Sequence, residues 1–178
     1  MDNGLIPKRY AKALYKVALD SGKTKELYDL SKRVIDAFRS NPELQKVLSN
    51  PFVPANDKEG LLIAAAGEDN ELFKRFVSLI ISQKRVEFAC QMMLAYRDIY
   101  RKDNHISQAK ITTASKLDEV RMRKLRDLVS GAFKDSVLEF TEAVDPNLIG
   151  GFVIDVDSVR MDASLSNELE QLRQTLLS

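Results

Sequence analysis

The side chains in this sequence that are suited to chemistry are few and scattered. His105 is the single histidine and Cys90 the single cysteine among 178 residues. A general base needs a partner within hydrogen-bond reach, and His105 falls in a segment predicted to link two domains. Cys90 lies beside the apolar face of a predicted helix, where a thiol ordinarily packs as a small hydrophobic group. One histidine and one cysteine exclude a disulfide within the chain, a multi-cysteine zinc site and a histidine-pair metal site.

Two further motifs can be interpreted as ligand sites. Asp155, Asp157 and Asp162 offer oxygen atoms to a cation, but no glycine and glutamate complete a known calcium-loop pattern, so a solvated strand face is favoured. Gly150-Gly151 matches neither the dinucleotide-binding nor the P-loop pattern, and a turn or bulge is favoured. The sequence therefore predicts no catalytic residue, no cofactor and no metal.

A basic run between residues 121 and 126 is the one candidate for contact with nucleic-acid phosphates. Acidic residues flank it, and helical spacing disperses its charges around the surface. The whole chain has 27 basic and 26 acidic residues, a net charge of +1, so it has no general attraction for nucleic acid. A solvated helix face is favoured over a nucleic-acid site. The run comprises Arg121, Arg123, Lys124 and Arg126.

The composition, 44% hydrophobic and 30% charged with no tryptophan, is typical of a helix-rich soluble protein. The longest uninterrupted apolar stretch, Leu61 to Ala66, is far shorter than the roughly 18 residues of a membrane span. The first ten residues contain neither an apolar signal core nor an arginine-rich transit segment. We therefore expect a protein that stays in the cytosol and does not insert into a membrane.

Hydrophobic periodicity predicts a mainly α fold, with a six-helix bundle over residues 1–104. Pro7 opens the first helix, which ends near Ser21-Gly22. Asn56 and Glu59 form a capping-box pattern for the fourth helix, which Gly67 can end in a left-handed conformation. The other predicted helices cover 24–40, a short segment near 44–48, 71–85 and 86–102.

The first and fifth predicted helices are apolar over more of their surface than a single neighbour requires. Ala11, Tyr15 and Leu19 widen the apolar arc of the first helix. In the fifth, seven apolar residues cover about 200°, roughly twice the stripe of an amphipathic surface helix. Either these helices lie at the centre of the bundle or they have a second binding partner.

The sequence pattern of residues 105–178 predicts a small α/β module with a short sheet and a terminal helix. Strands are expected over 106–114, 137–144 and 152–156, with 158–161 as a hairpin partner. A helix capped by Ser115, with Asp118 three residues on, is expected to follow the first strand. The terminal helix carries a narrow leucine stripe with the 4, 3, 4 spacing of a coiled-coil seam, formed by Leu165, Leu169, Leu172 and Leu176.

Both ends of the chain resemble one family. The segment LIGGFVIDVDSVRMDASLSNELEQLRQTLL is similar to the C-terminal signature of the delta subunit of F-type ATP synthases, equivalent to the mitochondrial oligomycin-sensitivity-conferring protein. The shared elements are an apolar pair before Gly150-Gly151, an alternating strand, and Asp162-Ala163-Ser164 before a leucine-spaced helix. RYAKALYKVAL resembles the opening segment of the family. The chain departs from the family at residues 155–158, where relatives often carry glycine.

The resemblance implies a non-catalytic stator, or peripheral stalk, subunit. It would link the catalytic head to the b-subunit stalk, so that the head resists rotor torque during proton-driven ATP synthesis. It implies a bacterial protein, one copy per complex, held peripherally at the cytoplasmic face of the cell inner membrane. In the family, an N-terminal helix of an alpha subunit binds a groove between the first and fifth helices. Here that groove is expected to involve Tyr10, Ala13, Leu14, Val17, Phe73, Phe76, Val77 and Ile80.

The resemblance also implies that the C-terminal region meets the C-terminal ends of the b subunits. Its candidate contact is the leucine stripe, Leu165, Leu169, Leu172 and Leu176. Packing of that stripe on the chain's own sheet is an equal alternative. From another class of function, the chain could be a helical adaptor of an unrelated complex that binds an amphipathic helix in the same groove.

Overall fold

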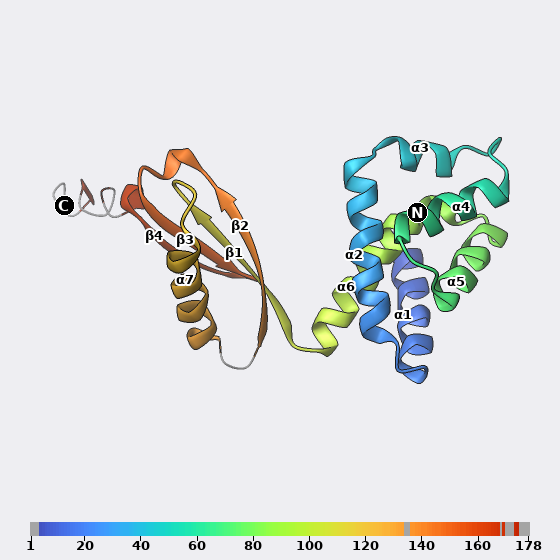
Figure 1. The fold of residues 1–178 in the computed structure, drawn as a ribbon, viewed down its shortest axis with the longest axis horizontal. Coiled ribbons are helices and arrows are strands. Elements are labelled where there is room, and N and C mark those ends of the chain that lie inside the picture. The colour runs from blue at the N-terminus through green and yellow to red at the C-terminus, as the bar shows by residue number, and fades with distance from the viewer. Residues whose placement is uncertain (1–3, 134–135, 168, 170–172, 175–178) are drawn as a thin grey trace. The chain divides into compact units, whose positions relative to one another are not determined.

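The computed structural model describes residues 4–133, 136–167, 169 and 173–174. The chain divides into two compact units, Met1–Arg101 and Lys102–Ser178. The described residues are mainly helical, and the one small sheet among them belongs to the C-terminal unit, as the sequence predicted (Figure 1). The finer prediction, that a six-helix domain ends at residue 104, stays a prediction. No helix in the described residues is long and apolar enough to cross a membrane.

The N-terminal unit is built from consecutive helices with short connections (Figure 1). A 3-10 helix precedes α6, so α6 begins three residues later than the periodicity predicted. Lys84 takes a left-handed conformation with φ 53°, so the helix before it ends at Ser82, three residues before its predicted end at residue 85. The elements are α1 (Leu5–Asp20), α2 (Thr24–Ser40), α3 (Glu43–Ser49), α4 (Ala55–Ala66), α5 (Glu71–Ser82), η1 (Val86–Phe88) and α6 (Ala89–Asp103).

The two ends of α4 differ from each other in how they are capped. The predicted capping box is wrong, because α4 follows Pro54 and no side chain accepts a hydrogen bond from its first turn. Glu59 instead accepts a hydrogen bond from the Ser78 hydroxyl at 3.0 Å. The predicted left-handed end at Gly67 is confirmed by its φ of 73°. There the Arg33 Nε donates to the Ala66 carbonyl at 2.7 Å, which satisfies one of the helix's terminal acceptors.

Aromatic residues of α1, α2 and α6 meet inside the N-terminal unit. The ring centroids of Tyr15 and Tyr96 lie 5.7 Å apart, and those of Tyr28 and Tyr100 are stacked at 4.2 Å. The hydroxyl of Tyr96 donates to the Thr24 carbonyl at 3.1 Å, while burial raises the pKa of this phenol. A neutral, hydrogen-bonded phenol can be buried at little cost, so it ties α6 to the start of α2.

The C-terminal unit is a four-stranded sheet with the order β2-β1-β3-β4. β1 and β2 are parallel because α7 connects them as a crossover, and the remaining pairs are antiparallel. α7 covers one face of the sheet, where Ile111, Val129 and Ile154 are buried together (Figure 1). The elements are β1 (Ile106–Thr113), α7 (Glu119–Ala132), β2 (Val137–Val144), η2 (Pro146–Leu148), β3 (Gly151–Val156) and β4 (Val159–Ser164).

The start of α7 corrects a prediction. Ser115 does not cap this helix. Asp118 does, since its carboxylate accepts from the Arg121 backbone N–H at 2.7 Å. Asp118 thus has the position typical of an N-cap, in extended backbone geometry just before the first helical residue.

Candidate functional site

An apolar groove lies between α1 and α5 and has a volume of about 210 Å³. It exists because both helices are apolar on more than one side, as their sequences indicated. Each helix therefore buries one face in the unit and leaves another at the groove. The lining residues are Tyr10, Ala13, Leu14, Val17, Leu72, Arg75, Phe76 and Leu79.

On α1, the wide apolar arc is divided between the core and the groove. Ala11 and Tyr15, which seemed only to widen the arc, are buried in the core. Tyr10, Ala13 and Val17 line the groove, and Val17 remains 49% exposed. The residues at i, i+3 and i+7 thus form a stripe that remains partly exposed among the described residues of this unit.

On α5, the structure separates the four predicted groove residues. Phe76 lines the groove. Phe73, Val77 and Ile80 do not, because they face the interior and are at most 2% exposed. Hydrophobicity alone could not separate these positions, since every one of them is apolar.

Three lining residues of α5 were absent from the predicted set: Leu72, Arg75 and Leu79. Leu72 and Leu79 belong to the wide apolar arc that the sequence indicated. They are seven residues apart, which puts them on one face two turns apart. Leu79 is 49% exposed, much like Val17 across the groove.

The groove is almost uncharged. Among its described lining residues only Arg75 carries a charge, and its guanidinium lies 3.8 Å from the Glu71 carboxylate one turn away. An exposed pair of this kind contributes little to stability. Apolar walls with one cation at the rim suit the apolar face of an amphipathic helix, which binds through anchors at i, i+3, i+4 and i+7.

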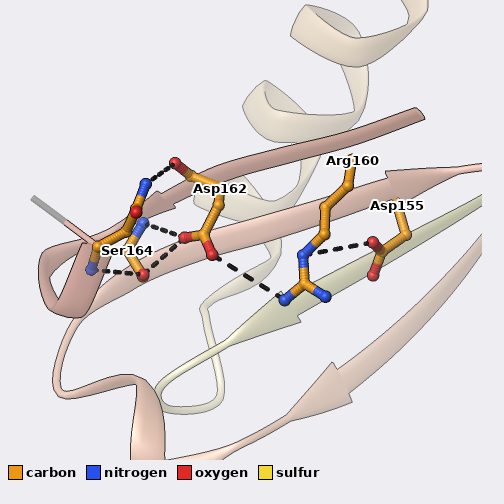
Figure 2. Close-up of polar contacts among 5 residues, drawn as sticks. Asp155, Arg160, Asp162 and Ser164 are labelled. Atoms are coloured by element: carbon orange, nitrogen blue, oxygen red, sulfur yellow. Dashed lines mark hydrogen bonds and ion pairs between the residues drawn. The ribbon is translucent and has the colours of Figure 1, made fainter. Parts of the chain in front are cut away.

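A second candidate surface begins at the C-terminal end of β4, where the strand is followed by a helical turn. Asp162 accepts hydrogen bonds from Ser164, and the Ser164 hydroxyl in turn accepts from the Asn167 N–H at 3.3 Å (Figure 2). The Leu165 N–H donates to the Gly150 carbonyl at 3.1 Å. The Asp-Ala-Ser motif is therefore a helix-capping device, and the first glycine of the Gly-Gly pair anchors the helical turn that starts at Leu165.

The leucine stripe is only partly within the described residues. Leu165 and Leu169 are 46% and 57% exposed. Leu172 and Leu176 lie outside the described residues. Whether the stripe contacts a partner stays a prediction.

Two of the three acidic residues singled out in the sequence pair with an arginine, while the third, Asp157, accepts a hydrogen bond from the Gln108 N–H at 3.1 Å. Arg160 lies between Asp155 and Asp162, with its Nε 3.8 Å from the first and its Nη2 3.9 Å from the second (Figure 2). The Ser164 hydrogen bonds, and to a smaller extent Arg160, lower the pKa of Asp162. In the described part of the chain, no group of three or more His, Cys, Asp or Glu side chains could hold a metal ion.

None of the remaining chemical candidates lines the groove. His105 is exposed at a left-handed φ of 51°. Cys90 is half-buried on α6, and burial raises the pKa of its thiol. In the basic run, Arg121 lies 3.3 Å from the Asp118 carboxylate, and Arg126 pairs with Glu142. These ion pairs partly neutralise the run.

Comparisons with known proteins cover nearly the whole chain. The family described as ATP synthase delta (OSCP) subunit matches residues 6–176. The chain is 37% identical to the ATP synthase subunit delta of Phocaeicola vulgatus, over 98% of this chain and 95% of the relative. It is also 37% identical to that of Parabacteroides distasonis, over 99% and 98% of the two chains.

A solved structure shares the fold. A chain of the Toxoplasma gondii mitochondrial ATP synthase hexamer matches with a TM-score of 0.71 and 18% identity, covering 97% of both chains. The family match and the relatives cover both units described above. The chain belongs to the ATP synthase delta (OSCP) subunit family.

Proposed function

We propose that this chain is a non-catalytic stator subunit of an F-type ATP synthase, which joins the catalytic head to the peripheral stalk. The observation that carries the proposal is the uncovered apolar groove between α1 and α5 in a chain of this family. The relatives named above are called ATP synthase subunit delta. A stator needs binding surfaces and no reaction centre, and neither His105 nor Cys90 lines the groove.

The head partner is the N-terminal helix of an alpha subunit. Its apolar face would lie along Tyr10, Ala13 and Val17 on one wall and Phe76 and Leu79 on the other. Affinity would come from burying the apolar surface that these side chains leave exposed, most of all at Val17 and Leu79, at about 25 cal/mol per Å² removed from water. Arg75 at the rim would favour an acidic residue on the polar side of the incoming helix.

The stalk partner is the C-terminal ends of the b subunits, bound through the C-terminal unit. Leu165 and Leu169 are the described members of its leucine stripe, and both are about half exposed. The two ends of the protein would then hold different partners, with one copy in each complex. The complex would keep it peripherally at the cytoplasmic face of the cell inner membrane, during proton-driven ATP synthesis.

Calorimetry tests the head interaction directly. The full chain is titrated with a synthetic peptide of the alpha-subunit N-terminus from the same organism. We expect saturable binding at one site and a negative heat-capacity change, because apolar surface is buried. A scrambled peptide of the same composition is the control. No heat of binding to the native peptide would contradict the proposal.

A pull-down from cell extract separates this function from that of an adaptor in an unrelated complex. Recovery of ATP synthase head subunits supports the stator. Recovery of a different assembly without them would support the adaptor, which the family assignment does not favour.

A further inference from the structure

A second cavity in the N-terminal unit is larger than the groove and different in chemistry. It has a volume of about 460 Å³ and lies where the α3–α4 connection, the start of α4 and the segment after α5 come together. Its walls include apolar Leu48, Val53 and Ile81 together with charged Lys58 and Lys84. None of these residues lines the α1–α5 groove. Its size falls in the range of about 300 to 1,000 Å³ that small-ligand sites occupy.

Lys58 is the unusual side chain in this cavity. The residue as a whole is only 9% exposed, but its Nζ is not among the buried unpaired polar atoms of the described residues, so the stem is buried while the ammonium reaches solvent. Within the part of the chain that the structure describes, its ammonium has neither a hydrogen-bond acceptor nor an ion-pair partner. Because the side chain lines the cavity, its charge is available to a bound anion there.

The N-terminus of α4 lies at the same cavity, since Ala55 is one of the lining residues. The helix has no side-chain cap, and its first intrahelical bond runs from the Lys58 N–H to the Pro54 carbonyl at 3.2 Å. The three backbone N–H groups before Lys58 precede that bond and so have no partner within the helix. A helix N-terminus with free N–H groups attracts anions, phosphate above all.

The other charges at the cavity are Lys84 and Glu87, and both are exposed. Lys84 holds a left-handed backbone, and its N–H donates to the Ile81 carbonyl at 2.9 Å. Two lysines and one glutamate give the lining a net positive charge, to which the helix terminus adds. Asp57, in the first turn of α4, is exposed and does not line the cavity.

We propose that this cavity binds a small organic phosphate. A phosphate dianion complements two ammonium groups and an open helix terminus, whereas one carboxylate would leave the second lysine uncompensated. The apolar wall formed by Leu48, Val53 and Ile81 would hold an organic group that inorganic phosphate lacks. This site is independent of the proposed head and stalk contacts.

NMR of the ¹⁵N-labelled full chain tests the proposal, with phenyl phosphate, inorganic phosphate and benzoate as probes at constant ionic strength. We expect phenyl phosphate to shift the amide signals of residues 55–58 saturably. Inorganic phosphate should bind the same amides several-fold more weakly, and benzoate more weakly still. No saturable shift with phenyl phosphate, or benzoate binding as tightly as phenyl phosphate, would overturn the assignment.

Substitutions of single lysines test whether phenyl phosphate binds in this cavity. Lys58→Met keeps the length and apolar stem of the side chain but removes its charge, so affinity for phenyl phosphate should fall at least tenfold. Lys16→Met removes an exposed lysine of α1 that does not line the cavity, and it should leave the affinity unchanged. If Lys58→Met does not fold, Lys84→Met provides the same test with an expected fall of three- to tenfold. Equal affinity in the folded cavity variant and the wild type would refute the proposal.

Discussion

Asp162 accepts two hydrogen bonds from Ser164, one from its hydroxyl at 2.6 Å and one from its backbone N–H at 3.0 Å (Figure 2). Ser164 is 2% exposed and its hydroxyl also accepts from the Asn167 N–H, so the two residues together fix the end of β4 and the start of the helical turn. The Asp-Ala-Ser motif has this conformational role, rather than a role in binding a cation.

The carboxyl of Asp162 should titrate below the ordinary range of aspartate. The hydrogen bonds from Ser164 lower its pKa most, and Arg160 adds to this. Because the folded pKa is below the unfolded value, the stabilisation is complete above the unfolded pKa and is lost as pH falls through the folded pKa. An NMR titration of the carboxyl carbon should show a larger pKa increase for Ser164→Ala than for Arg160→Gln. The reverse order would contradict the assigned causes.

Gly151→Ala should destabilise the C-terminal unit. Gly151 has φ 79°, and a Cβ there would overlap the backbone carbonyl of Ala163, which cannot move without breaking the β3–β4 pairing. We expect a loss of roughly 2 to 4 kcal/mol in the free energy of unfolding, measured with denaturant. Gly131→Ala is the matched control, because a Cβ on that helical glycine meets nothing within 4 Å. It should stabilise by about 0.5 to 1 kcal/mol.

Val17→Asp should weaken binding of the alpha-subunit peptide. Val17 lines the groove, and a carboxylate there would be desolvated by the incoming apolar helix. We expect the affinity measured by calorimetry to fall roughly ten- to hundredfold, about 1.4 to 2.7 kcal/mol. Leu19→Asp is the control, because Leu19 is on the same helix with 57% exposure but does not line the groove. Equal losses in both variants would place the peptide elsewhere.

Deletion of residues 165–178 should separate the two proposed contacts. Stalk binding should be lost while head binding is retained, since the groove belongs to the other compact unit. Co-sedimentation with isolated head, and separately with b-subunit fragments, measures both. Circular dichroism of the truncated chain is the control for folding. Loss of both interactions with loss of helical signal would indicate unfolding of the whole chain instead.

Cys90 should react slowly with thiol reagents. Burial raises the pKa of its thiol, although Arg97 acts in the opposite direction, so less thiolate is present at neutral pH than in an exposed cysteine. We expect at least tenfold slower labelling than for a cysteine-containing peptide at pH 7.5, and equal rates in denaturant. Labelling of the native chain at the peptide's rate would show that the thiol is accessible and not shifted.

Local patterns were sufficient where a single segment determines its own conformation. The strand at Val137–Val144 has the predicted bounds, and Gly67 ends α4 in the predicted left-handed conformation. Both depend on alternation or on one residue's backbone freedom, and neither needs a distant contact. Capping was less predictable. Ser115 and Asn56 are acceptable caps by type, but the observed helices start after Asp118 and Pro54. The loop before each helix must also connect to the preceding element. This constraint influences which of several suitable residues becomes the N-cap.

Four features can be recognised without the structure: the helical class, the change from helices to an α/β module along the chain, the family resemblance at both ends, and the wide apolar arcs of the first and fifth helices. The sequence does not show which part of each apolar arc is core and which part lines the groove. In the folded chain, the residues that line the groove include Val17, Leu72 and Leu79, whereas the core takes Ala11, Tyr15, Phe73, Val77 and Ile80. The two sets cannot be separated by sequence because periodicity gives the angular position of each side chain around its own helix, but not the direction from which the neighbouring helices pack. Lys58 could not be singled out from the sequence for the same reason, because the burial of its stem at the cavity depends on residues that only the fold brings around it.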